Sequence, residues 1–213
     1  MPGFLRWGLL AVLVTAVPVT VGVLVLDEDT TTPAPEEPPS YTSTALTDYD
    51  TSVVGLSRAP FCDRVPEEAV TEALDGEAGA FTTYVNGDSA KIAPGLRDVA
   101  HEYGCRIEGG GREEIRAWLF APPVTRSRAG DLVDEAAGGP GCTEPTGAPA
   151  YGSPSVALVC PAGDRRLASF RGLFGDAWLA CSLAVPATVS ESELLDRAGR
   201  WCVAVAEAAA ARD

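Results

Sequence analysis

The sequence predicts an α+β domain in which an antiparallel sheet carries its helices mainly on one face. Short segments that alternate apolar and polar residues, typical of half-buried strands, are joined by glycine-containing turns. In addition, a strand, a break and a helix of the pattern Leu-x-Asp-x-Ala occur in the same order at 117–136 and at 177–198. We therefore expect an internal duplication of a strand-strand-helix unit, with the two halves packed about a pseudo-twofold axis.

Residues 1–26 predict a transmembrane signal anchor. Residues 7–26 are apolar or small without interruption, which is long enough for a helix to cross the hydrocarbon core. Arg6 precedes this run and acids follow it, so the positive-inside rule places the N-terminus in the cytoplasm and the rest of the chain outside. A cleaved signal peptide is the alternative, but the run exceeds a usual h-region and no Ala-x-Ala-like site closes it.

The next segment, 27–58, predicts a disordered stalk. It is rich in Thr, Pro, Ser and acids, and it has too few apolar side chains to offset the entropy of ordering the chain. Its composition also permits O-glycosylation. The folded part is then a single extracytoplasmic domain at 59–213, a size that supports one hydrophobic core.

All the cysteines follow the predicted stalk and therefore lie in an oxidising compartment, where three disulfides are the expected arrangement. They are Cys62, Cys105, Cys142, Cys160, Cys181 and Cys202. No two stand close enough for a zinc knuckle and His101 is the only histidine, so we predict no metal and no other cofactor. Among the connectivities that six cysteines allow, we favour pairing Cys62 with Cys105 and Cys142 with Cys202. Cys160 and Cys181 are then expected on neighbouring strands.

In the first half of the domain, Pro66 and the acids after it begin a short helix that Gly76 ends. A loop is expected at 76–88, because Asn-Gly is a turn signal. A second short helix is expected at 94–103, with His101 facing solvent. After these come two strands that form a hairpin, followed by a short helix; their ranges are 105–108, 113–120 and 131–137.

The second half begins with three strands that we expect at the centre of the sheet, at 155–160, 166–172 and 177–185. Ser190 and Glu193 then form a capping box for the closing helix. That helix carries one broad apolar stripe, which includes Trp201 and one of the cysteines and should face the core.

The formal net charge of −14 excludes a nucleic-acid partner, which needs a basic face to neutralise phosphates. No nucleophile elbow accompanies the single histidine and no C-x-x-C motif is present, so no catalytic residue is predicted. Adjacent acids point to different faces of a strand or helix and indicate solvated surfaces. The one basic cluster is Arg165, Arg166 and Arg171, which is either a set of solubilising edge charges or a binding patch for an acidic or phosphate ligand.

The domain opens with FCDRVP, contains a Gly-Cys-Arg strand and closes with LLDRAGRWCVAVAE. With the N-terminal span and acidic stalk, this pattern resembles single-pass cell-envelope proteins of actinobacteria whose function is unknown. The resemblance covers 61–209 and implies a non-enzymatic envelope protein, without adding site residues. The chain departs from many such proteins because it lacks an acylated cysteine after the apolar run.

The sequence thus predicts a membrane-anchored, extracytoplasmic binding or interaction module without catalytic activity. We expect its partner to be an envelope protein or a wall-associated ligand, and its contact with the membrane to be made by residues 7–26. Two alternatives stay open. One is a sensory or regulatory ectodomain that acts through a membrane partner, and the other is an envelope hydrolase that uses carboxylates, which a raised carboxylate pKa in a concave pocket would favour.

Overall fold

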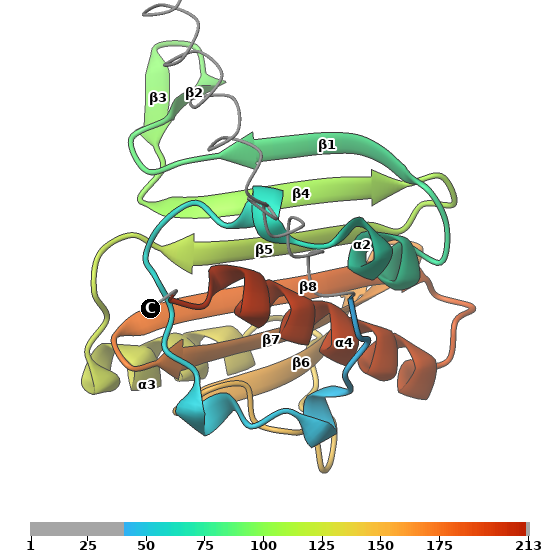
Figure 1. Ribbon diagram of the computed structural model, residues 1–213. Helices are drawn as coiled ribbons and strands as arrows, with labels where there is room; N and C mark the ends of the chain where they lie inside the picture. Colours follow the sequence, from blue (N-terminus) through green and yellow to red (C-terminus); the bar gives the residue numbers. More distant parts are fainter. Residues whose placement is uncertain (1–40, 212–213) are drawn as a thin grey trace, which may run out of the picture. The chain divides into compact units, whose positions relative to one another are not determined.

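The computed structural model describes residues 41–211 (Figure 1). The predicted anchor at 1–26 and the first part of the predicted stalk, 27–40, lie outside the described residues. Within the described part, no helix combines the length and the apolar character that crossing a membrane requires.

The fold class is α+β, as the sequence predicts. A six-stranded antiparallel sheet has the strand order β1-β4-β5-β8-β7-β6, and β2 and β3 form a separate hairpin. The strands are β1 (Ala78–Tyr84), β2 (Ser89–Ala93), β3 (Leu96–Val99), β4 (Glu102–Gly109), β5 (Glu114–Phe120), β6 (Ser155–Ala162), β7 (Arg165–Phe174) and β8 (Ala177–Pro186). The helices are α2 (Glu67–Leu74), α3 (Arg126–Ala137) and α4 (Glu191–Ala209), with short 3₁₀ turns η1 (Leu46–Asp48), η2 (Thr51–Val53) and η3 (Cys62–Arg64).

The helices lie mainly on one face of the sheet, since α2 and α4 share a face and α3 lies on the other. Strand β8 shows this by alternation: Leu179 and Leu183 belong to the core beneath α4, whereas Trp178 packs with residues of α3. The strand-strand-helix order is therefore present twice, as β4-β5-α3 and β7-β8-α4. The expected pseudo-twofold packing is not observed, because a twofold axis relating the antiparallel β5 and β8 would put both helices on one face.

The core is formed by α4 against β7 and β8. Ser190 caps the helix, its side chain accepting a hydrogen bond from the Glu193 N–H at 3.2 Å, as the predicted capping box requires. The apolar stripe faces the sheet as expected: Trp201 is 1% exposed, and its indole N–H donates to the carbonyl of Arg116 in β5 at 3.2 Å. This bond ties the closing helix to the middle of the sheet.

Two predicted elements of the first half are wrong. The expected loop at 76–88 contains β1, and the expected helix at 94–103 is replaced by β3 and the start of β4. Strand β1 has no alternation of buried and exposed residues, because it is an edge strand whose side chains are nearly all exposed. The helix prediction fails at Pro94-Gly95, a turn dipeptide in which Gly95 has a φ of 77° that a right-handed helix does not admit.

The folded unit begins before the predicted boundary at residue 59. Leu46 is 4% exposed and lies against Gly199 of α4, where an added Cβ would be 3.2 Å from the Leu46 Cβ. Leu56 forms a β-bridge with Ala210, and the Tyr41 hydroxyl donates to a carboxylate of α2 at 2.9 Å. Residues 41–58, predicted as part of the stalk, are therefore part of the domain.

The three predicted disulfides are present, but two of the favoured pairings are wrong. Cys62 pairs with Cys105, as expected. The other bonds join Cys142 to Cys160 and Cys181 to Cys202. Cys160 lies on β6 and Cys181 on β8, and β7 separates these two strands, so they are not neighbours. The two cysteines also face opposite sides of the sheet. Each instead reaches a cysteine on its own side of the sheet: Cys160 of β6 pairs with Cys142 in the loop after α3, and Cys181 of β8 pairs with Cys202 in α4.

Candidate functional site

The structure divides the predicted basic patch between the two faces of the sheet. Side chains alternate along β7, so Arg166 points to the α4 face, where its guanidinium lies 3.9 Å from Glu191 at the start of that helix. Arg165 and Arg171 point to the other face. The three arginines therefore do not form one binding site.

The face that carries Arg165 and Arg171 is only partly covered. Helix α3 packs on β6, β7 and the nearby end of β8, at one end of the sheet (Figure 1). In the described part of the chain, β5 meets the α3 cluster on this face only at its last residue, Phe120, and no helix core cluster includes a residue of β4 on this face. Polar and aromatic side chains cover these strands instead.

A buried carboxylate organises the arginines of this uncovered region. Glu114 is 5% exposed and accepts hydrogen bonds from Arg106, at 2.7 Å, and from Arg116, while Arg165 lies 3.8 Å away. Burial by itself raises the pKa of Glu114, but the hydrogen bonds and charges of Arg106 and Arg116 outweigh it and leave the pKa below its usual value. Three guanidinium groups thus surround one fixed anion and hold excess positive charge, which Glu108 beside Arg106 offsets in part.

A row of aromatic side chains runs beside these arginines. The register places Tyr84, Gly104 and Trp118 opposite one another on β1, β4 and β5. The Tyr84 ring lies over Gly104, where an added Cβ would collide with it, so glycine is required for this close approach. The Tyr84 hydroxyl donates to Glu102 at 2.7 Å, and burial together with this carboxylate raises the pKa of the tyrosine.

The row ends in Arg171, which forms no salt bridge with a described residue. The register continues from Trp118 across Ala180 to Arg171, and the small Ala180 lets the Arg171 guanidinium reach 5.7 Å from the centre of the tryptophan ring. Arg171 forms no salt bridge among the described residues, and its Nε is buried without a hydrogen-bond partner. Burial lowers the pKa of Arg171, and the charge of Glu135 in α3 offsets this effect only in part. Its guanidinium keeps donors that an anionic ligand would satisfy.

We call the surface formed by Tyr84, Arg106, Arg116, Trp118 and Arg171 the arginine–aromatic face. All of these except Arg171 line a shallow cavity of about 270 Å³. The neighbouring row of the sheet adds two buried serines, Ser182 and Ser169, the second of which has no hydrogen-bond partner for its hydroxyl. Glu102 also lines the cavity, so the surface offers cationic, aromatic and hydroxyl groups beside one carboxylate.

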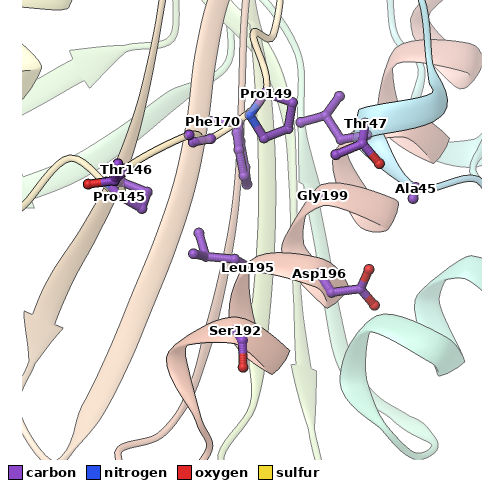
Figure 2. Close-up of a pocket in the computed structure, with 13 residues that line it drawn as sticks. Ala45, Thr47, Pro145, Thr146, Pro149, Phe170, Ser192, Leu195, Asp196 and Gly199 are labelled. Atoms are coloured by element: carbon purple, nitrogen blue, oxygen red, sulfur yellow. The ribbon is translucent and has the colours of Figure 1, made fainter.

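A second cavity, of about 290 Å³, lies on the opposite face between α4, η1 and the loop at 145–149 (Figure 2). Leu195 and Phe170 contribute apolar side chains to it. Asp196 is the only ionisable residue in its lining, and it accepts a hydrogen bond from Arg200 at 3.1 Å. This cavity therefore lacks the paired carboxylates that a hydrolase needs.

The remaining candidate groups do not assemble into a site. All six cysteines are in disulfides, and His101 is exposed between β3 and β4. Within 41–211, no three His, Cys, Asp or Glu side chains are placed to hold a metal ion.

The sequence reasoning missed Tyr84, Gly104 and Trp118 as members of the site. For Trp118 a signal was present, since alternation in the predicted strand 113–120 puts it on the same side as Glu114 and Arg116. For Tyr84 and Gly104 there was no signal, because the strand that carries Tyr84 was not recognised.

Comparison with protein-family models and with curated proteins gives no match.

Proposed function

We propose that this chain is a membrane-anchored, extracytoplasmic binding module of the cell envelope, without catalytic activity, and that its ligand docks on the arginine–aromatic face. The observation that carries the proposal is the guanidinium of Arg171, which lies over Trp118 and forms no salt bridge with a described residue, although the charge of Glu135 in α3 acts on it. Burying a guanidinium without a direct salt bridge is unfavourable, and an anionic ligand that contacts it would compensate for that cost.

The chemistry of the face favours a wall-associated acidic saccharide. Arg171 and Arg116 offer N–H donors in the geometry that suits a carboxylate. Trp118 and Tyr84 offer aromatic surface beside those donors, against which the apolar face of a sugar ring packs. A sugar ring that carries a carboxylate can bind the arginine donors and pack against the aromatic side chains at the same time.

The compartment supports this proposal. Three disulfides in one domain are typical of proteins that fold in an oxidising space, and all three join segments distant in sequence. The membrane anchor at 7–26 stays a prediction from the sequence. An anchored domain outside the membrane would meet wall polymers directly.

The carboxylates of the domain do not favour the hydrolase alternative. Glu114, the buried one, has a lowered pKa and is held by arginines, which suits a structural anion and not a general acid. Burial raises the pKa of Glu207, but this residue lies beside Tyr49 on the α4 side and does not line the cavity shown in Figure 2.

The test is calorimetric titration of the full chain, in detergent micelles, with oligogalacturonate as the acidic saccharide probe. Arg171→Gln should weaken binding by about tenfold, the loss expected for one charge-assisted hydrogen-bonded group. Arg166→Gln is the matched control, because it removes the same charge from the same strand on the opposite face, and it should change the affinity by less than about twofold. Equal losses in the two variants, or no binding by the unmodified chain, would contradict the proposal.

A further inference from the structure

The two edges of the sheet are built differently. The outer edge of β6 is covered: Thr143 exchanges two backbone hydrogen bonds with Val159, of 2.9 and 2.8 Å, and the Cys142–Cys160 disulfide fastens the same segment to the strand. Pro161, near the end of β6, has no N–H to offer. These features prevent another strand from pairing there.

The edge at β1 has none of these protections. Strand β1 pairs with β4 on one side, and no other segment of the described chain pairs with its outer side. Its sequence, AGAFTTY, contains no charge and no proline, and six of its seven residues are exposed. Phe81 in its middle is 54% exposed. The pairing of β1 with β4 shifts register between Ala78 and Phe81, so the regular part of this uncharged edge, residues 81–84, is the template for an additional strand.

A cavity of about 480 Å³ lies beside this edge, between α2 and β1. Its apolar lining includes Val70, Phe81 and Ile107. Its charged lining residues are all acids, namely Asp63, Glu67 and Glu77. None of the three forms a salt bridge with a described residue. The cavity therefore suits a side chain with an apolar stem and a positive end.

We propose that the outer edge of β1 binds an extended, basic segment of another envelope protein, which adds a strand to the sheet. Backbone hydrogen bonds to β1 would hold the segment, and alternate side chains would point toward the α2 side. A lysine or arginine at such a position would pack its stem against Phe81 and bring its charge to Glu67 and Glu77. This site is distinct from the arginine–aromatic face, which lies on the opposite side of the sheet.

Charge argues against the two occupants that this chain itself could supply. Its segment 27–40 has four prolines and five acids and no base, so it can neither pair along a strand nor neutralise the cavity. A second copy would pair through residues 76–90, which hold two acids and no base. A basic segment of a different protein is the complementary partner.

The test uses the full chain in detergent micelles and three heptapeptides. The first alternates Lys and Val, the second alternates Glu and Val, and the third keeps the lysines but replaces each Val with Pro, which removes backbone N–H groups without changing the charge. Hydrogen exchange followed by mass spectrometry should show slower exchange in 78–84 with the first peptide only. Titration should give no comparable affinity for the other two.

The Glu67→Gln/Glu77→Gln double variant should bind the first peptide about fivefold more weakly, as expected for two exposed ion pairs. Glu68→Gln is the control, because this exposed acid of α2 does not line the cavity, and it should bind as the unmodified chain does. Arg171→Gln should also leave the peptide affinity unchanged.

Three results would overturn the proposal. The first is that the proline peptide binds as well as the first peptide, because binding would then need no strand addition. The second is that the first peptide either fails to bind or binds without slowing exchange in 78–84. The third is a dimer in sedimentation experiments whose β1 amides are protected without any peptide, since the occupant would then be a second copy.

Discussion

Replacement of Glu114 by Gln should destabilise the domain by about 1–2 kcal/mol at pH 7. The carboxylate accepts charge-assisted hydrogen bonds from Arg106 and Arg116, and such bonds contribute about 1.5–3 kcal/mol each. The estimate is smaller than their sum because the two arginine side chains are 44% and 49% exposed, so water solvates them when the carboxylate is lost.

The effect of this substitution should depend on pH in a defined direction. The pKa of Glu114 is lower in the folded chain than in the unfolded chain, so the carboxylate contributes stability above the unfolded value of about 4.3. That contribution is lost as the pH falls through the folded value. The difference in unfolding free energy between the unmodified chain and Glu114→Gln should therefore be constant above about pH 5 and shrink toward pH 3.

Urea unfolding at pH 7, 5 and 3, with the disulfides intact, measures this difference. Glu108→Gln is the matched control, because Glu108 also lies beside Arg106, at 2.8 Å, but is 46% exposed, and its loss should cost less than about 0.5 kcal/mol. If Glu114→Gln and Glu108→Gln were equally costly at pH 7, burial would not be the source of the effect. A difference that stayed constant down to pH 3 would refute the assigned direction of the pKa shift.

Three further substitutions test the rest of the structure. Leu46→Ala should lower the free energy of unfolding in urea by about 2–3 kcal/mol, since Leu46 is buried against α4. A change near zero would show that residues 41–58 do not belong to the folded domain. The Cys142→Ser/Cys160→Ser double variant should lose about 3 kcal/mol, the value for a closed loop of this length, and unchanged stability would contradict the bond. Gly104→Ala should displace Tyr84 and weaken saccharide binding, which near-ultraviolet circular dichroism and titration would show; unchanged spectra would refute the contact.

The sequence predicted the fold best where burial leaves a periodic pattern. Strand β5 buries mainly one side against the core and its residues alternate accordingly, and the apolar residues of helix α4 recur at a helical spacing. Strand β8 is buried on both faces, and its sequence is a nearly continuous apolar run. Strand β1 buries almost nothing, so its sequence carries no period that a reader of the chain could detect. Strand β3 was missed for a different reason, because the apolar residues between 96 and 103 fit a helical spacing that runs from β3 into the start of β4.

The disulfides and the arginine patch show the limit of sequence proximity. Cys160 and Cys181 look like partners because both lie on predicted strands, yet the side of the sheet that each faces depends on strand order, which no local pattern specifies. Arg165 and Arg166 are adjacent in sequence and therefore lie on opposite faces of β7. Alternation alone would have separated them once the strand was assigned.

Strand β5 links the core to the arginine–aromatic face. The carbonyl of Arg116 accepts the hydrogen bond of Trp201 from the α4 side, whereas its side chain binds Glu114 on the other side. The position of Arg116 is therefore fixed from both sides, by the packing of α4 and by the buried carboxylate. Rigid placement lowers the entropy that a ligand must overcome on binding. A sheet that is covered on one face and partly open on the other can thus position a surface side chain such as Arg116 through contacts on both of its faces.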